Sequence, residues 1–194
     1  WAYILYNLTD SGMAIELLER SAVGLPAHRF LMKSLLKAAV FVGCIAGQVG
    51  LGVLADQCGA RRAFVCAALF AIAGALWAAL AARHFTRSKS AFYWHVIFAR
   101  AVMGVGVGGA FPLSTFATRA SAQPALVAEE KLSWAFSGQA LGFCGPFLVV
   151  LAMYPRLTES LIAVWAVVLA FPALVQVGLL ASLPRLAFLD HADW

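Results

Sequence analysis

The sequence predicts an all-α membrane protein built as a bundle of six transmembrane helices. Hydrophobic residues make up 63% of the 194 residues and charged residues only 12%, about half the share that a soluble protein carries. Five segments are apolar over the roughly 20 helical residues needed to cross a bilayer, and a sixth is a weaker match. No segment alternates polar and apolar residues as the strands of a membrane barrel do. We therefore expect a multi-pass integral membrane protein, in a membrane that the sequence does not identify.

The first element spans residues 1–25 and is the least apolar, because it carries Asp10 and three further charged residues. The chain opens at Trp1 rather than at an initiator methionine, and this first segment is already apolar. We therefore expect a fragment whose amino terminus lies inside or near a helix, and no cleaved signal peptide is needed to explain it.

The five apolar segments follow in order, at residues 35–55, 63–82, 92–113, 132–154 and 161–183. The first of them is interrupted only by Lys37 near its edge and Gln48 within it, the next has no charge, and the third carries Arg100. Short links rich in turn formers or charge separate the helices. They lie at residues 24–26, 57–62, 83–90, 121–131 and 155–159.

The formal net charge of +5 comes from basic residues scattered mostly between apolar segments. We interpret them as contacts with anionic lipid headgroups, since no interleaved basic and aromatic face suggests a nucleic acid. Placing the amino terminus in the cytoplasm puts more Lys and Arg outside than inside, against the usual bias, so the orientation stays open. The cysteines, which we expect to be small buried hydrophobes, show no metal-ligand spacing: Cys44, Cys58, Cys66 and Cys144.

No catalytic constellation indicates an enzyme, and no cofactor is implied. The stretch MGVGVGG contains the dinucleotide-binding spacing at Gly104, Gly106 and Gly109. That spacing has meaning only after a strand in a soluble βαβ unit, whereas here it lies in a membrane-length apolar run. We therefore expect these glycines to allow close helix packing, as we do for those that line the preceding segment: Gly43, Gly47 and Gly50.

Residues 52–62 place a carboxylate, a glycine and two arginines in one short turn between two membrane-length helices. Asp56 could pair with Arg61 or Arg62, or cap a neighbouring helix. Contacts of this kind can form and break as two helical bundles rock, so we predict a gating role for all three residues. An ordinary solvated turn is the alternative.

Three polar side chains within the apolar segments are candidate solute contacts. Arg100 is costly at membrane depth, so it either attracts an anion, pairs with Asp10 or Asp56, or extends its head group to the interface. The amides of Gln139 and Gln48 can donate to an oxyanion or bond a neighbouring helix.

The sequence resembles the major facilitator superfamily, whose signature loop is similar to residues 52–62. It also resembles the proton-coupled phosphate transporter branch. The motifs are LTDS at residues 8–11, GQVGLG at 47–52, and FARAVMGVGVGG at 98–109, followed by PLS at 112–114. The resemblance covers nearly the whole chain but only the first of two six-helix halves.

This resemblance implies a secondary active transporter that moves a small solute by alternating access, with inorganic phosphate or another anion as the solute. Residues 1–194 would form the amino-terminal half, and the carboxy-terminal half of the same protein and protons would be its partners. The resemblance implies that Arg100 corresponds to an arginine of the family's fourth helix. It also implies that Gln139 corresponds to a glutamine that faces the substrate, and Asp10 is a further candidate for the pore.

The sequence departs from the phosphate branch after the glycine pair, where an acid and a tyrosine are replaced by Ala110 and Phe111. These changes remove a proton carrier and a phosphate-binding hydroxyl, so proton coupling and phosphate specificity both stay open. A transport-inactive relative that serves as a membrane sensor or as a structural subunit is the alternative.

Overall fold

A computed structural model of the chain describes residues 6, 9, 29–84, 89–120, 125–153, 155 and 161–182. Five long helices lie in this part of the chain, and Tyr6 and Thr9 are helical as well. The helices are α2 (Arg29–Cys58), α3 (Ala60–His84), α4 (Lys89–Ala120), α5 (Ala125–Ala152) and α7 (Leu161–Ser182).

The helices confirm the predicted order and type of the elements, but their bounds differ. α2, α3 and α4 begin before and end after their predicted apolar segments. The apolar run marks only the part that lies in hydrocarbon, whereas the helix continues into its polar flanks. Three described helices are long and apolar enough to cross a membrane, over Phe30–Cys58, Ala60–Ala81 and Ala91–Ala117.

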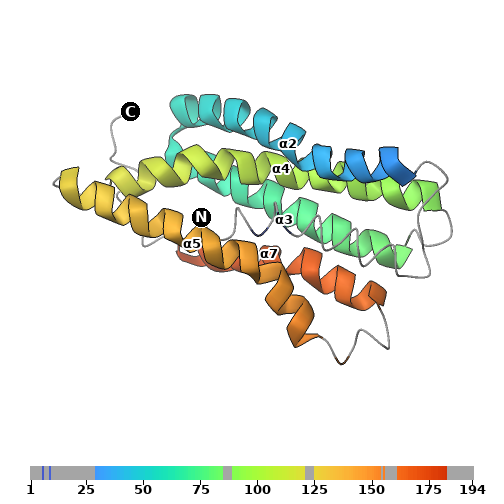
Figure 1. Cartoon of the computed structure of the whole chain (residues 1–194). Helices are drawn as coiled ribbons and strands as arrows, with labels where there is room; N and C mark the ends of the chain where they lie inside the picture. Colours follow the sequence, from blue (N-terminus) through green and yellow to red (C-terminus); the bar gives the residue numbers. More distant parts are fainter. Residues whose placement is uncertain are drawn as a thin grey trace.

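α4 is the central helix of the described bundle. It packs extensively against α2 and α3, and α3 also packs against α7, whereas α5 touches α4 and α7 at few places (Figure 1). At one end of the bundle, core residues from the starts of α2, α4 and α7 pack against residues from the end of α3. At the other end, residues from the ends of α2 and α4 pack against residues from the start of α3. α3 therefore runs antiparallel to the other three helices.

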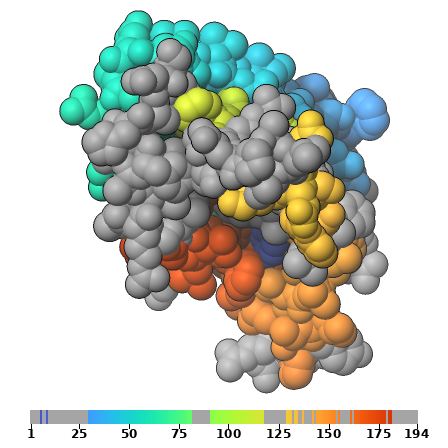
Figure 2. All heavy atoms as spheres, turned by 90° about the vertical axis from the view of Figure 1, so that its left-hand side faces the viewer, coloured from blue at the N-terminus to red at the C-terminus, as the bar shows by residue number. Residues whose placement is uncertain are grey.

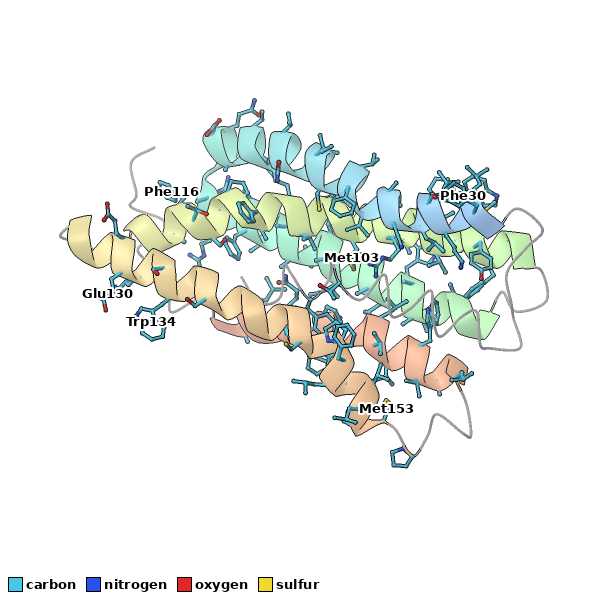
Figure 3. The ribbon with its side chains drawn as sticks, in the orientation of Figure 1. Phe30, Met103, Phe116, Glu130, Trp134 and Met153 are labelled. Atoms are coloured by element: carbon cyan, nitrogen blue, oxygen red, sulfur yellow. The ribbon has the colours of Figure 1, made fainter. Side chains whose placement is uncertain are left out.

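Three clusters of buried apolar residues follow one another along α4. The first gathers around Trp165, Phe92 and Val96, and its two rings lie 5.4 Å apart between centroids. The second surrounds Met103, which Figure 3 shows amid the bundle. The third lies near the α2–α3 connection. Its members are Leu51, Ala55, Ala63, Phe64, Ala67, Ala110 and Leu113.

Large apolar side chains also cover the outside of the bundle. Along α2 the exposed residues recur about every turn, as Phe41, Ile45, Val49 and Val53. In water such a continuous apolar surface would be unstable, but in lipid it is the expected outer face. At the start of α5, Glu130 and Trp134 point away from the bundle (Figure 3). A charge beside a tryptophan is typical of the bilayer interface.

The cysteines depart in part from the expectation of burial. Cys44 and Cys66 are half-buried, whereas Cys58 and Cys144 are exposed. The expectation was wrong for Cys58 and Cys144. Cys58 occupies the last turn of α2, and Cys144 lies on α5, which has few contacts with the other described helices.

Candidate functional site

Arg100 lies inside α4, more than two turns from the start of the helix, and only 2% of its side chain is exposed. An arginine that reached the interface would expose its head group, so this burial is against the interfacial alternative. A charge in this position needs polar or charged company, so attraction of an anion and pairing with an acid both remain predictions for Arg100.

The surface of α4 on which Arg100 lies is set by two glycine-lined contact faces. On the first face, a Cβ atom on Gly104 would overlap the carbonyl oxygen of Val40, and one on Gly108 would overlap that of Cys44. We call this contact the α2–α4 seam; its members are Val40, Gly43, Cys44, Gly47 and Leu51 of α2 with Ala101, Gly104, Val105, Gly108 and Gly109 of α4.

On the second face, Gly106 of α4 and Gly74 of α3 bring the backbones of these two helices together. Gly106 meets the main chain of Ala67, and Gly74 meets that of Met103. Since α4 turns by about 100° per residue, Arg100 lies between the two contact faces and is held there by rigid neighbours. The glycines thus fix the depth and direction of the buried cation.

The packing role predicted for the glycines is confirmed at five positions. Gly104 and Gly106 contact neighbouring backbone, Gly109 contacts the side chain of Leu51, and Gly43 and Gly47 face the backbone of α4. The same prediction was wrong for Gly50, which has nothing within 4 Å of its Cβ direction. Gly50 is exposed on α2, at a point where no neighbouring helix approaches it.

The connection between α2 and α3 is shorter than predicted. Only Gly59 lies outside the helices, with a φ of 89° that belongs to the left-handed region. Its N–H donates to the carbonyl of Ala55 at 2.9 Å, and its own carbonyl accepts from the N–H of Ala63 at 3.2 Å. A left-handed glycine directly after a helix is a common helix cap. The predicted link at residues 57–62 was therefore wrong, because the residues on either side of Gly59 are helical.

The predicted gate residues lie on both sides of this turn. Asp56 and Arg62 are exposed, and Arg61 is half-buried. The three residues stand at one end of the bundle, where α2 joins α3.

The predicted solute residues are not brought together by the described part of the chain. Gln48 is exposed on α2, whereas Arg100 is buried. Gln139 lies on α5, but its side chain is outside the described residues, and so is all of Asp10. Ala110, which replaces the acid of the phosphate branch, is 5% exposed in the third core cluster.

Two buried polar residues are not among the predicted site residues: Tyr6, which contacts α7, and Gln176, which lies on α7. Tyr6 donates its hydroxyl to the carbonyl of Val168 at 3.1 Å. Gln176 is 2% exposed, and its Oε1 accepts no hydrogen bond within the described residues. Gln176 could have been noticed as the single amide in a run that is otherwise apolar from Leu161 to Leu180.

Comparisons with known proteins agree with this architecture. An inorganic phosphate transporter of Toxoplasma gondii is 27% identical over 172 residues, which cover 87% of this chain and 30% of that protein. A repressible high-affinity phosphate permease of Neurospora crassa is 37% identical over 83 residues, or 43% of this chain and 14% of the permease.

The xylose transporter XylE of E. coli, in a partially occluded inward-open conformation, has the same fold with a TM-score of 0.75 and 20% identity. The likeness covers 96% of this chain and 47% of XylE. The chain thus spans less than half the length of each protein it matches here, and it adopts one half of the major facilitator fold.

The family model described as "Sugar (and other) transporter" matches residues 18–185, which is most of the chain. Together with the apolar spans, this match makes the chain part of an integral, multi-pass membrane protein. The chain belongs to the sugar (and other) transporter family of the major facilitator superfamily.

Proposed function

We propose that the full-length protein is a secondary active transporter that moves a small anion by alternating access, and that residues 1–194 form its amino-terminal half. The family match supports transport, and the length of the relatives supports a second half of similar size. In such proteins the solute site lies near the bilayer midplane between the halves, and the halves rock around it.

The buried cation at Arg100 is the observation that carries the choice of an anion. A guanidinium stays charged in any physiological environment and presents five donors in a planar fork that fits a tetrahedral oxyanion. Arg100 keeps this group at 2% exposure, where the low local dielectric strengthens its attraction for an anion. Inorganic phosphate is our leading solute, because two relatives are named as phosphate transporters.

The other predicted residues complete this proposal. Gln139 would donate amide hydrogens to the anion, and Asp10 would face Arg100 or carry the coupling proton. Gln48, exposed on α2, would meet the anion only along its path and not beside Arg100. Asp56, Arg61 and Arg62 would form a gate with the missing half. Ala110 cannot carry a proton, so coupling, if it is to protons, needs a carrier elsewhere in the protein.

A transport-inactive relative that acts as a membrane sensor or a structural subunit is the second candidate. The observation in its favour is that Ala110 is packed in the third core cluster. The position where the resemblance implies a titratable acid is thus filled as part of the apolar core.

Uptake of labelled phosphate into proteoliposomes that contain the full-length protein tests the proposal, with and without an inward proton gradient. We expect uptake by the wild type, a loss of at least tenfold for Arg100→Met, and a smaller loss for Gln139→Ala. Lys37→Met is the matched control, because it removes an exposed cation from α2 and should leave uptake unchanged.

Gradient-stimulated uptake would establish proton coupling, and equal uptake under both conditions would exclude it. Absence of phosphate uptake from protein shown to be folded would reject phosphate as the solute. Absence of uptake for sulfate and for organic phosphates as well would favour the sensor or subunit.

A further inference from the structure

Pro172 leaves a backbone acceptor of α7 without its usual donor. In a regular helix the carbonyl of residue 168 accepts from the N–H of residue 172, and proline has no N–H. The proline ring also crowds this carbonyl and turns it away from the helix axis. Within a bilayer no water replaces the lost bond, so an unsatisfied carbonyl would cost several kcal/mol.

The hydroxyl of Tyr6 supplies the missing donor. It donates to the carbonyl of Val168 at 3.1 Å, across 162 positions of sequence, and both residues are buried. The Tyr6 ring lies beside Phe171, with 5.4 Å between the ring centroids. Tyr6 is thus bonded to α7 one turn before Pro172 and packed against the residue that precedes the proline.

The Tyr6 ring also contacts α5. A Cβ atom on Gly145 would lie 2.5 Å from Cδ2 and 2.9 Å from Cε2 of Tyr6, so only glycine leaves room for the ring. Pro146 follows directly and is another proline inside a described helix. Tyr6 therefore stands between proline-containing segments of α5 and α7.

This position matters because α5 has few direct contacts with the rest of the described bundle. The later part of α5 and α7 lie next to each other at the bottom of Figure 2. α5 also carries Gln139. Tyr6 therefore joins α5 to α7 where these two helices have few direct contacts of their own.

We propose that Tyr6 is a positioning residue for transport: its hydroxyl replaces the N–H that Pro172 lacks, and this link holds the first helix, α5 and α7 in register. The role in transport rests on the proposed function, whereas the link to Pro172 does not. The link is also reversible, because one hydrogen bond can break and reform as the helices move.

A double-mutant cycle in the full-length protein tests this proposal, with Tyr6→Phe, Pro172→Ala and the combination. Tyr6→Phe keeps the ring and removes only the donor. Pro172→Ala restores an N–H to Val168, so the tyrosine hydroxyl is then no longer required. Tyr93→Phe, at a buried tyrosine in α4, is the matched control for the loss of a hydroxyl.

We expect Tyr6→Phe to lower the maximal rate of phosphate uptake about three- to tenfold in the wild-type background, the ratio that one hydrogen bond typically gives. KM should stay unchanged, because the hydroxyl bonds α7 and not the solute. In the Pro172→Ala background the same change should alter the rate less than twofold. Tyr93→Phe should have equal effects in both backgrounds.

Thermal unfolding midpoints of the same variants in detergent separate this inference from the choice of solute. If Tyr6→Phe lowers the unfolding midpoint in the wild-type background but not in the Pro172→Ala background, the link is supported even if the wild type carries no phosphate. An equal fall in the unfolding midpoint in both backgrounds would overturn the link, and so would an unchanged midpoint in both. Retained uptake in a protein that has lost the link would overturn the positioning role.

Discussion

Gly108 of α4 lies directly against the main chain of Cys44 in α2, so close that a Cβ atom at position 108 would overlap the Cys44 carbonyl. Gly104 stands in the same relation to Val40 one turn earlier. At these two positions the helices therefore touch through their backbones. Since lipid gives no hydrophobic drive for helix association, this close packing is a principal source of stability for the α2–α4 seam.

We expect Gly108→Ala to destabilise the full-length protein by about 1–3 kcal/mol, because the backbones must separate to admit the methyl group. Gly50→Ala is the matched control on α2, since nothing lies within 4 Å of its Cβ direction. It should leave stability unchanged or raise it slightly, as alanine favours helix. Unfolding midpoints in detergent measure the difference between the two variants. Equal midpoints would contradict close backbone packing in the α2–α4 seam.

Gly59 provides a second contrast between glycines. Its φ of 89° is in the left-handed region, which costs other residues about 1–2 kcal/mol. We expect Gly59→Ala to lower stability by that amount and Gly52→Ala, in the last turns of α2 with open space around it, to be neutral or stabilising. If chemical unfolding gave the two variants equal stability, the turn would not need its glycine.

Most of the helical order follows from the sequence, because apolar length and charge-free stretches are direct signals for membrane spans. The close packing of α2 on α4 was also predictable, from glycines four residues apart in both helices. The turn at Gly59 was placed too broadly, since Gln57 and Arg61 are polar and were assigned to a loop. Polarity marks where a helix leaves hydrocarbon, not where it ends.

The candidate site was predicted less completely. The sequence left open whether Arg100 attracts an anion, pairs with an acid or extends to the interface, and its burial depends on how α4 packs against its neighbours. The pairing of Tyr6 with Val168 joins residues 162 positions apart, and no local pattern encodes such a contact. Gln176 was visible as a lone amide, but its burial depends on how α7 packs against α3.

Gln176 offers a stability test that follows from its burial. Its Oε1 accepts no hydrogen bond from the described residues, and an unsatisfied buried acceptor costs about 1–3 kcal/mol. Methionine has a similar length and no such acceptor, so Gln176→Met should raise the unfolding midpoint of the full-length protein. Gln57→Met, at an exposed position, should leave it unchanged. A lower midpoint for Gln176→Met would mean that the amide is bonded in the complete protein.

Arg100→Lys separates the charge of Arg100 from its shape. Lysine keeps a positive charge but presents a compact ammonium in place of the planar five-donor fork, and it is more strongly hydrated. If Arg100 binds the anion through two parallel hydrogen bonds, the loss of one of them should reduce phosphate uptake about tenfold, mostly by raising KM. Arg100→Gln keeps hydrogen-bond donors without charge and should abolish uptake. Initial rates over a range of phosphate concentrations distinguish these outcomes. Wild-type kinetics in Arg100→Lys would show that charge alone matters, and wild-type kinetics in Arg100→Gln would remove Arg100 from the anion path.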